Sequence, residues 1–303
     1  FSAGTSPYDA VLFMPAWIAD YAKHLEPIEP LMEKTGVDLK LDDIHPKIRD
    51  AYCSWDGVLY AIPWDGDQHN MFYNKEAFER EENKAKFEKK FGYELKPPET
   101  WDEFLDVAKF FTGWDWLGGT RKRYGAVEAW QRGGYAFWWW ADKFASYGGV
   151  WFDEDMHPLI NSPAGIKALE IMVELKKCVP PGTFSFGYPE CEHAFVKAEA
   201  PMVIQWSSTG KTAMDPTVSE IVGKVGIALV PGGRVKGKIL RRPGLPTGWV
   251  WGIPKYIPEE RKELILRVIE IISRPENALK ICLDPKTAVD PWRMSSFDEE
   301  KWA

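Results

Sequence analysis

Asp65 and Asp67 are the residues of this chain whose type and spacing most directly suggest chemistry. They lie within the polar and aromatic run Trp64–His69, and Gly66 between them permits the backbone angles of a tight corner. Carboxylates and amides hydrogen-bond hydroxyl groups, while an indole offers a flat apolar face to the C–H side of a sugar ring. The run therefore suits sugar binding. A surface turn with one core tryptophan is the alternative that the run by itself leaves open.

The same two aspartates could serve as the paired carboxylates of a glycosidase, which flank the bond that is cleaved. Other catalytic signatures are missing from the sequence, which contains no GxSxG, HExxH, P-loop or GxGxxG pattern. The five histidines are scattered, and only His69 stands beside candidate site residues. We therefore expect a binding protein and not an enzyme. A glycoside hydrolase that uses Asp65 and Asp67 is the less favoured alternative.

Composition narrows the class of protein further. A chain of 303 residues is long enough for two lobes of the usual domain size of about 100–200 residues. The net charge of −7 argues against nucleic-acid binding, which needs a basic surface. No run approaches the ~20 apolar residues of a membrane span, and no signal peptide is present. The 16 Trp indicate either large cores or a surface for flat ligands.

The four cysteines show no CxxC spacing, so we expect no structural zinc site. In a secreted protein Cys178 could pair with Cys191, and four separately buried thiols are the other interpretation.

The elements around the aspartates follow from apolar periodicity. Alternation at Val58, Tyr60 and Ile62 predicts a half-buried strand that Pro63 ends, because proline has no N–H to donate. Further strands are expected at residues 8–14, 202–206, 225–229 and 248–254. Helices are expected at residues 16–24, 75–90, 258–273 and 275–282.

Two helix starts carry cap signals. Thr100 and Glu103 have the spacing of a capping box before an apolar helical stripe. Ser162 and Pro163 predict the start of another helix, and Ile166, Leu169, Met172 and Val173 are expected to form its buried stripe.

Several stretches of the sequence, in the same order along the chain, resemble motifs of the extracellular solute-binding proteins of ABC transporters. The resemblance is to their large, maltose-binding-protein-like sugar-binding group (family 1). They cover nearly the whole chain: residues 60–67, 72–78, 97–105, 200–206, 225–233, 248–254 and 290–295. The resemblance implies an α/β, two-lobed periplasmic-binding-protein fold with a hinge between the lobes and a ligand cleft.

On this family pattern we expect an N-lobe of residues 1–72 plus 248–284, incomplete at its start, and a C-lobe of residues 73–247. Residues 285–303 are expected as a C-terminal segment near the hinge. Crossings between lobes are expected near Phe72 and near Thr247. The N-terminal strand, helix and strand of the family are absent here, and we favour their omission from the chain, because an incomplete sheet would expose its edges.

Aromatic residues supply most of the other candidate ligand contacts. The resemblance points to Trp17 and Trp249, and to Trp206 at the end of a strand that borders the sugar in the family. Successive indoles at Trp138, Trp139 and Trp140 point about 100° apart on a helix, so at least one faces outward or into a cleft. We expect one of the three to contact the ligand, and Trp139 is included in the set for them.

Polar candidates complete the set. Gln68 and His69 adjoin the aspartates, and the resemblance makes Arg293 a candidate donor to sugar oxygens. Ser207 and Ser208 are more readily explained as a helix cap. The full set of expected ligand-binding residues is Trp17, Trp64, Asp65, Asp67, Gln68, His69, Trp139, Trp206, Trp249 and Arg293.

The resemblance implies a monomeric receptor, periplasmic or extracellular, with a lipid anchor at the cell surface as an open alternative. It would capture a mono- or oligosaccharide between the lobes, close by hinge bending and deliver the ligand to a membrane permease. A polyol, a polyol phosphate or another non-sugar solute is the alternative ligand. No cofactor or catalytic residue is expected. Asp65→Ala is expected to weaken binding, because a ligand hydroxyl loses a charged partner.

Overall fold

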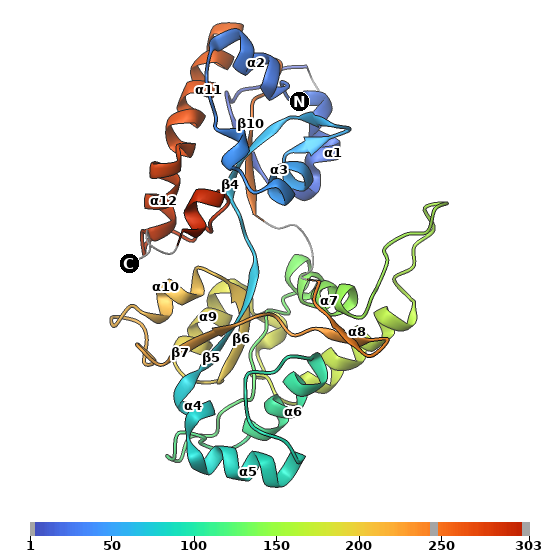
Figure 1. Cartoon of the computed structure of the whole chain (residues 1–303), viewed down its shortest axis with the longest axis vertical. Helices are drawn as coiled ribbons and strands as arrows, with labels where there is room; N and C mark the ends of the chain where they lie inside the picture. Colours follow the sequence, from blue (N-terminus) through green and yellow to red (C-terminus); the bar gives the residue numbers. More distant parts are fainter. Residues whose placement is uncertain (1–3, 243–247, 299–303) are drawn as a thin grey trace. The chain divides into compact units, whose positions relative to one another are not determined.

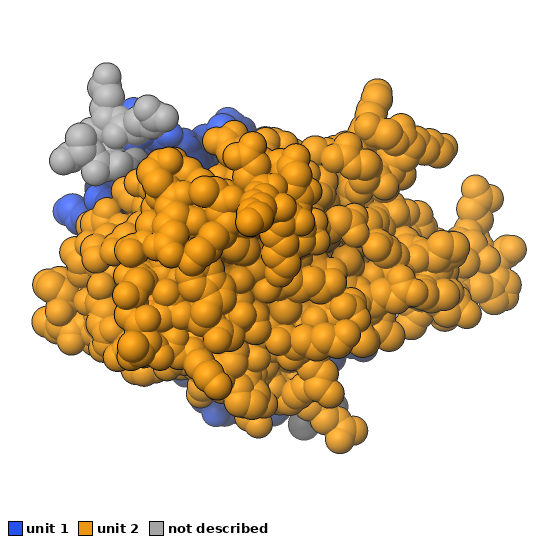
Figure 2. All heavy atoms as spheres, turned by 90° about the horizontal axis from the view of Figure 1, so that it is seen from below, with its two compact units in different colours: residues 1–68, 246–303 blue, residues 69–245 orange. Residues whose placement is uncertain are grey.

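A computed structural model describes residues 4–242 and 248–298 of the chain. The chain divides into two compact units (Figures 1 and 2). Unit 1 combines residues 1–68 with 246–303, and unit 2 is residues 69–245. The first passage of the chain between lobes was expected near Phe72, which lies inside a strand of unit 2. The boundary between units 1 and 2 lies between Gln68 and His69. The second expected passage, at Thr247, lies outside the described residues.

Unit 1 is built on a small antiparallel sheet with the strand order β1-β10-β4 (Figure 1). The strands are β1 (Val11–Phe13), β4 (Ala61–Asp65) and β10 (Trp249–Gly252), and β2 (Ser54–Trp55) pairs separately with β3 (Val58–Leu59). The helices and 3-10 turns of unit 1 are η1 (Pro15–Trp17), α1 (Ile18–Tyr21), η2 (Ala22–His24), α2 (Ile28–Thr35), η3 (Leu41–Asp43), α3 (Pro46–Tyr52), α11 (Glu259–Ser273), α12 (Pro275–Leu283) and η5 (Met294–Phe297).

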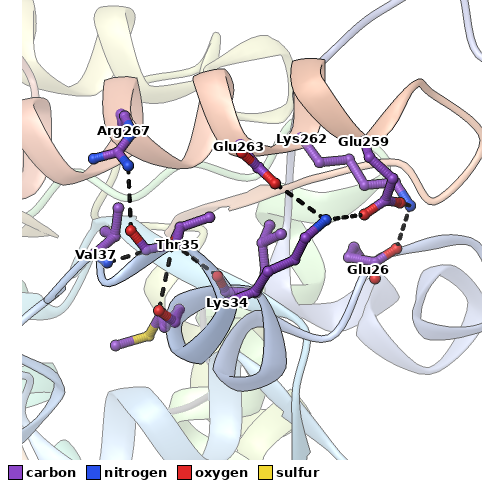
Figure 3. Close-up of polar contacts among 10 residues, drawn as sticks. Glu26, Lys34, Thr35, Val37, Glu259, Lys262, Glu263 and Arg267 are labelled. Atoms are coloured by element: carbon purple, nitrogen blue, oxygen red, sulfur yellow. Dashed lines mark hydrogen bonds and ion pairs between the residues drawn. The ribbon is translucent and has the colours of Figure 1, made fainter.

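Helices α2 and α11 come from opposite ends of the chain and pack together within unit 1. Their apolar faces join a core that includes Ile28, Leu31 and Leu266. At the rim of this contact Lys34 Nζ lies 2.9 Å from Glu259 Oε2 and 3.0 Å from Glu263 Oε1 (Figure 3). Burial of the apolar stripes therefore holds the two helices together, and the ion pairs lie at its exposed edge.

Unit 2 contains an antiparallel sheet with the order β6-β5-β7, in which β5 is central (Figure 1). The strands are β5 (His69–Asn74), β6 (Met202–Trp206) and β7 (Val225–Ala228), with a separate hairpin of β8 (Gly233–Val235) and β9 (Lys238–Leu240). The helices and turns of unit 2 are α4 (Lys75–Glu79), α5 (Glu81–Phe91), α6 (Trp101–Phe111), α7 (Gly134–Ser146), α8 (Pro163–Leu175), η4 (Thr183–Ser185), α9 (Tyr188–Val196) and α10 (Thr209–Ala213).

The core of unit 2 is rich in aromatic side chains. Strand β6 is buried along its whole length, and its neighbour β5 buries Met71 and Phe72. Helix α6 presents Trp101, Phe104 and other apolar side chains to the same core. Some of the tryptophans therefore serve packing, because Trp101, Trp116 and Trp139 are fully buried.

The structure corrects three local expectations. Pro63 does not end the strand, because it lies within β4 opposite Val250. Strand β4 is at the edge of its sheet, where the missing N–H of proline is tolerated. The expected helix at 75–90 is interrupted at Arg80, whose backbone is extended. At the capping box, Thr100 accepts from the Glu103 N–H, whereas Glu103 itself accepts from the N–H of Glu99.

Most of the stripe expected to be buried on α8 is exposed, and only Met172 of its four residues packs against the core. Ile166, Leu169 and Val173 are each more than half exposed, whereas Gly165, Ala168, Ile171 and Leu175 are buried. A side chain at Gly165 would collide with the carbonyl of Ile160. Close approach of the neighbouring backbone therefore selects the face with small residues, and the larger apolar residues remain at the surface.

The four cysteines are all described and all buried, and none is in a disulfide. The pairing of Cys178 with Cys191 that the sequence left open is therefore not formed. Burial raises the pKa of the Cys53 thiol well above its usual value, which keeps that thiol protonated.

Candidate functional site

Three carboxylates of unit 1 meet at one point. Oxygen atoms of Asp65, Asp67 and Asp290, one from each residue, all lie within 4.8 Å of one another. The side chains of Asp65 and Asp290 are buried, and Asp67 is partly exposed. We call these three residues the acidic cluster.

The acidic cluster is assembled by backbone contacts between distant parts of the sequence. The backbone N–H of Asp290 donates to Asp65 Oδ1 at 2.7 Å, and the Gly66 N–H donates to the carbonyl of Asp290 at 3.1 Å. In the sheet, Trp249 pairs with Asp65 next to an irregularity in the register. Gly248 has a φ of +110°, and a Cβ there would strike the Asp65 carbonyl, so only glycine fits this close approach.

The environment of Asp67 favours its protonated form. Loss of solvent raises the pKa of this carboxyl well above its usual value, and the negative charges of Asp65 and Asp290 raise it further. The backbone N–H of Gly248 opposes this shift by donating to the carboxylate. A protonated carboxyl group can donate as well as accept a hydrogen bond, so a raised pKa widens the pH range in which the cluster can pair with a hydroxyl group in either direction.

Aromatic residues of unit 1 differ in how much surface they offer. Trp17 and Trp249 are 48 % and 40 % exposed, so their indole faces are open to solvent. Trp64 is half-buried, and its ring packs edge-on against Trp251 at 5.9 Å between centroids. Gln68, which follows the acidic cluster in the chain, is exposed.

Arg293 is a buried anchor of unit 1. Its guanidinium donates to the carbonyls of Ser273 at 2.6 Å, Leu39 at 3.0 Å and Lys40 at 3.1 Å. It also lies 3.4 Å from Asp43, and burial lowers the pKa of the guanidinium. These contacts explain Arg293 as a structural residue that joins the C-terminal part of unit 1 to the turn at η3.

In unit 2 the candidates lie around the start of β5. His69 pairs with Trp206 in the sheet, and its Nδ1 lies 2.6 Å from Asp142 Oδ2 on α7. The imidazole centroid is 4.6 Å from that of Trp139 and 5.0 Å from that of Trp206. Trp206 is only 6 % exposed and packs edge-on against Tyr135, Tyr188 and its neighbours, so it does not form an open platform.

Among the three successive tryptophans of α7, Trp139 is fully buried, whereas Trp138 and Trp140 are partly exposed. Of the three indoles, those of Trp138 and Trp140 thus retain some exposed surface. Ser208 stands at the N-terminus of α10 but makes no side-chain cap bond. Its hydroxyl lies 3.2 Å from the hydroxyl of Tyr188 instead.

Two residues of these sites are absent from the sequence-based set. Asp290 is the first residue of the segment 290–295 that also contains the candidate Arg293, but nothing in the sequence places Asp290 beside Asp65. Asp142 lies in a helix of mixed composition, where an acidic residue is usually a solvated one. Only the fold shows that both carboxylates are buried next to candidate residues.

Residues 1–278 match the family described as bacterial extracellular solute-binding proteins, so the chain belongs to that family. The chain is 24 % identical over 257 residues to a probable amino-acid ABC transporter periplasmic-binding protein of Sinorhizobium fredii, covering 83 % of this chain and 53 % of the relative. It is also 24 % identical over 286 residues to an sn-glycerol-3-phosphate-binding periplasmic protein of Brucella melitensis, covering 91 % of this chain and 58 % of the relative. The chain thus spans between half and three fifths of the length of these relatives.

Solved structures confirm the two-lobed α/β fold. An ABC transporter solute-binding protein of Agrobacterium radiobacter K84 in complex with ribitol has a TM-score of 0.80 and 26 % identity, covering 99 % of this chain and 71 % of that one. A maltose-bound protein of T. maritima has a TM-score of 0.79 and 25 % identity, covering 99 % and 70 %. No helix in the described ranges 4–242 and 248–298 has the length and apolar character needed to cross a membrane.

Proposed function

We propose that this chain acts as the substrate-binding component of an ABC transporter and captures a neutral, hydroxyl-rich solute, a carbohydrate or a polyol, for delivery to a membrane permease. The acidic cluster of unit 1 is the observation that supports a hydroxyl-rich ligand. Its oxygens lie within 4.8 Å of one another, and hydroxyl groups can both donate to and accept from such a group. The exposed indole faces of Trp17 and Trp249 supply apolar surface of the kind that stacks on sugar rings.

A polyol phosphate is the second candidate, because the Brucella relative carries the name of an sn-glycerol-3-phosphate-binding protein. The carboxylates of the cluster oppose a phosphate dianion, since like charges repel. The cluster thus favours the neutral ligand. An amino acid, as in the name of the Sinorhizobium relative, would present an ammonium group to the same carboxylates and forms a third arm of the test.

The same geometry argues against a glycosidase. The two catalytic carboxyl groups of retaining enzymes are about 5–5.5 Å apart and those of inverting enzymes about 6.5–9.5 Å apart. In the acidic cluster three carboxylates meet at one point, whereas hydrolysis needs two that stand on either side of the bond that is cleaved. Binding without turnover is therefore the proposed activity.

A thermal-shift screen tests this function with a panel of ribitol, D-mannitol, maltose, sn-glycerol 3-phosphate and glycine. A ligand that binds only the folded state raises the melting temperature by mass action. We expect a neutral polyol or sugar to give the largest increase and to be recovered chemically intact. If only the phosphate or the amino acid raised the melting temperature, the proposal of a neutral ligand would be wrong. If the sugar disappeared during incubation, the protein would be an enzyme and not a receptor.

Asp67→Ala tests the acidic cluster directly. We expect this variant to weaken the affinity for the stabilising probe about tenfold in calorimetry, because a hydroxyl group of the ligand loses its hydrogen-bond partner. Asp42→Ala, at an exposed acidic position of the same unit, is the matched control and should bind as the wild type does. Asp65→Ala should weaken binding too, but it also removes the acceptor of the Asp290 N–H, so Asp67 gives the cleaner measurement.

A further inference from the structure

A short hairpin of unit 2 concentrates positive charge. Residues 233–242 include strands β8 and β9, and they contain no acidic residue, although the whole chain has a net charge of −7. We call this segment the basic hairpin. Its five basic residues are all exposed: Arg234, Lys236, Lys238, Arg241 and Arg242.

The charges at the tip of the basic hairpin are not neutralised within the chain. Lys236 and Lys238 make no ion pair with any residue in the described ranges. Lys236 and Gly237 form the turn with φ of +48° and +78°, angles that Asn and Gly adopt more easily than Lys. The turn therefore does not account for a lysine at the tip.

A second exposed segment of the same unit carries the opposite charge. Residues 150–160 lie between α7 and α8 and extend away from the body of unit 2 (Figure 1). We call this segment the acidic arm, because Asp153, Glu154 and Asp155 follow one another in it. Every residue from 152 to 158 is exposed.

The acidic arm is held in a defined shape by its own contacts. Asp153 Oδ1 accepts hydrogen bonds from the backbone N–H of Asp155 at 3.0 Å and of His157 at 2.8 Å. At its base the ring of Trp151 packs against Phe144 of α7, with 4.7 Å between the centroids. The acidic side chains are thus presented in a fixed position, which lowers the entropy cost of binding a partner.

The acidic arm and the basic hairpin adjoin in one copy of the chain without neutralising each other. Gly148, just before the arm, faces the hairpin, since a Cβ there would lie 3.9 Å from Val235. Nevertheless, no ion pair between the two segments is found in the part of the chain that the structure describes. Unit 2 therefore presents free charges of both signs on neighbouring segments.

Exposed apolar side chains accompany these charges. Val150, Phe152 and Ile160 of the acidic arm are each about half exposed, at 53 %, 47 % and 48 %. Apolar side chains among charged ones are the composition of a protein contact, with charges at its rim. An anionic lipid surface would attract the basic hairpin but repel the acidic arm beside it, so a protein fits both segments better.

We infer that two copies of this chain associate through these segments, with the acidic arm of each copy on the basic hairpin of the other. A two-fold contact needs a surface that is complementary to itself, and a surface with both charges side by side meets this requirement. The inference goes beyond the proposed function and does not depend on it. It replaces the monomer that the family resemblance implied.

Charge reversal in each segment tests the contact. The hairpin variant combines Lys236→Glu with Lys238→Glu, and the arm variant combines Glu154→Lys with Asp155→Lys. Sedimentation equilibrium at low ionic strength measures the dissociation constant of the dimer. We expect the wild type to dimerise and each variant to raise this constant about a hundredfold, because like charges then face each other at both symmetric contacts.

An equimolar mixture of the two variants is the decisive experiment. In the mixed pair a positive arm meets a negative hairpin and a negative arm meets a positive one, so dimerisation should return. Both variants keep a negative net charge, so general attraction between them cannot produce this result.

The matched control combines Lys89→Glu with Lys122→Glu, at exposed positions of unit 2 outside both segments. It carries the same change of charge as the hairpin variant and should dimerise as the wild type does. Circular dichroism and the melting temperature show that each variant is folded. Added salt should weaken the wild-type dimer, because it screens the charges.

A wild type that stays monomeric overturns the inference, as does a dimer that both variants leave unchanged. A mixture that stays monomeric shows that arm and hairpin do not pair. If the wild type is monomeric and sediments with phosphatidylglycerol vesicles, while the hairpin variant does not, the hairpin faces lipid and the inference is wrong. None of these outcomes bears on the ligand screen, which tests the proposed function separately.

Discussion

Buried charge is arranged differently in the core of unit 2 and at the acidic cluster of unit 1. Unit 2 buries opposite charges in pairs, such as Lys143 with Glu128 at 2.9 Å, with both side chains 0 % exposed. Unit 1 instead gathers Asp65, Asp67 and Asp290, three groups of the same sign, with oxygens within 4.8 Å of one another. The paired charges satisfy one another, whereas in the acidic cluster loss of solvent, and then repulsion by Asp65 and Asp290, raises the pKa of Asp67.

This difference indicates which buried charges maintain the fold and which are kept for another reason. A buried pair is costly to break, because removal of one partner leaves the other uncompensated. A cluster of like charges destabilises the folded chain, so its presence is better explained by a ligand than by stability. The pair of His69 and Asp142 stands between these cases, since one nitrogen of the ring is satisfied and the other is not.

The largest expected effect is a loss of stability when a buried charge pair of unit 2 is broken. Lys143→Met should lower the free energy of unfolding by about 3–5 kcal/mol, because Glu128 is left buried without its partner. Urea unfolding measures the loss. Lys167→Met is the control, since Lys167 pairs with Asp102 at the surface and should change stability little. Equal effects of the two substitutions would contradict the distinction between buried and exposed pairs.

The second-largest expected effect is a gain in stability on substitution of Asp67, and its size depends on pH. The pKa of Asp67 is raised in the folded state, mainly by burial and further by Asp65 and Asp290. As pH rises above the usual aspartate pKa of about 3.9, the unfolded chain releases this proton first, and stability falls until pH passes the raised folded value. Asp67→Asn should remove this loss, so its urea midpoint should exceed that of the wild type at neutral pH.

Below the usual aspartate pKa the two proteins should have the same stability, because Asp67 is then protonated in both states. Asp42→Asn, an exposed position, should follow the wild type at every pH. A urea midpoint of Asp67→Asn below that of the wild type at neutral pH would show that the acidic cluster stabilises unit 1, contrary to the comparison.

The smallest effect is expected at the exposed ion pairs between α2 and α11 (Figure 3). Lys34 is 49 % exposed, and its partners Glu259 and Glu263 are 59 % and 38 % exposed. Lys34→Met should leave the urea midpoint unchanged within error, because solvent screens such pairs and the apolar contact beneath them remains. A shift as large as that of Lys143→Met would show that these pairs, and not the apolar stripes, join the two helices.

Much of the fold could be predicted from local pattern. Strand β6 was expected at residues 202–206 and is found there, and the helix expected at residues 258–273 is α11, Glu259–Ser273. A continuous apolar run or a long helical stripe predicts which residues are buried, whatever element they pack against. The buried face of α8 could not be predicted in this way, because the fit of Gly165 against the Ile160 carbonyl outweighs the size of Ile166 and Leu169.

The sequence by itself determined the family, the α/β class and the run in which Asp65, Asp67 and His69 stand, because these depend on residue type and order along the chain. Only the tertiary structure decided which charges lie together. Asp290 reaches Asp65 across 225 positions, and Asp142 reaches His69 across 73. Such contacts depend on how strands and helices pack, and local periodicity carries no information about a partner so distant in the chain.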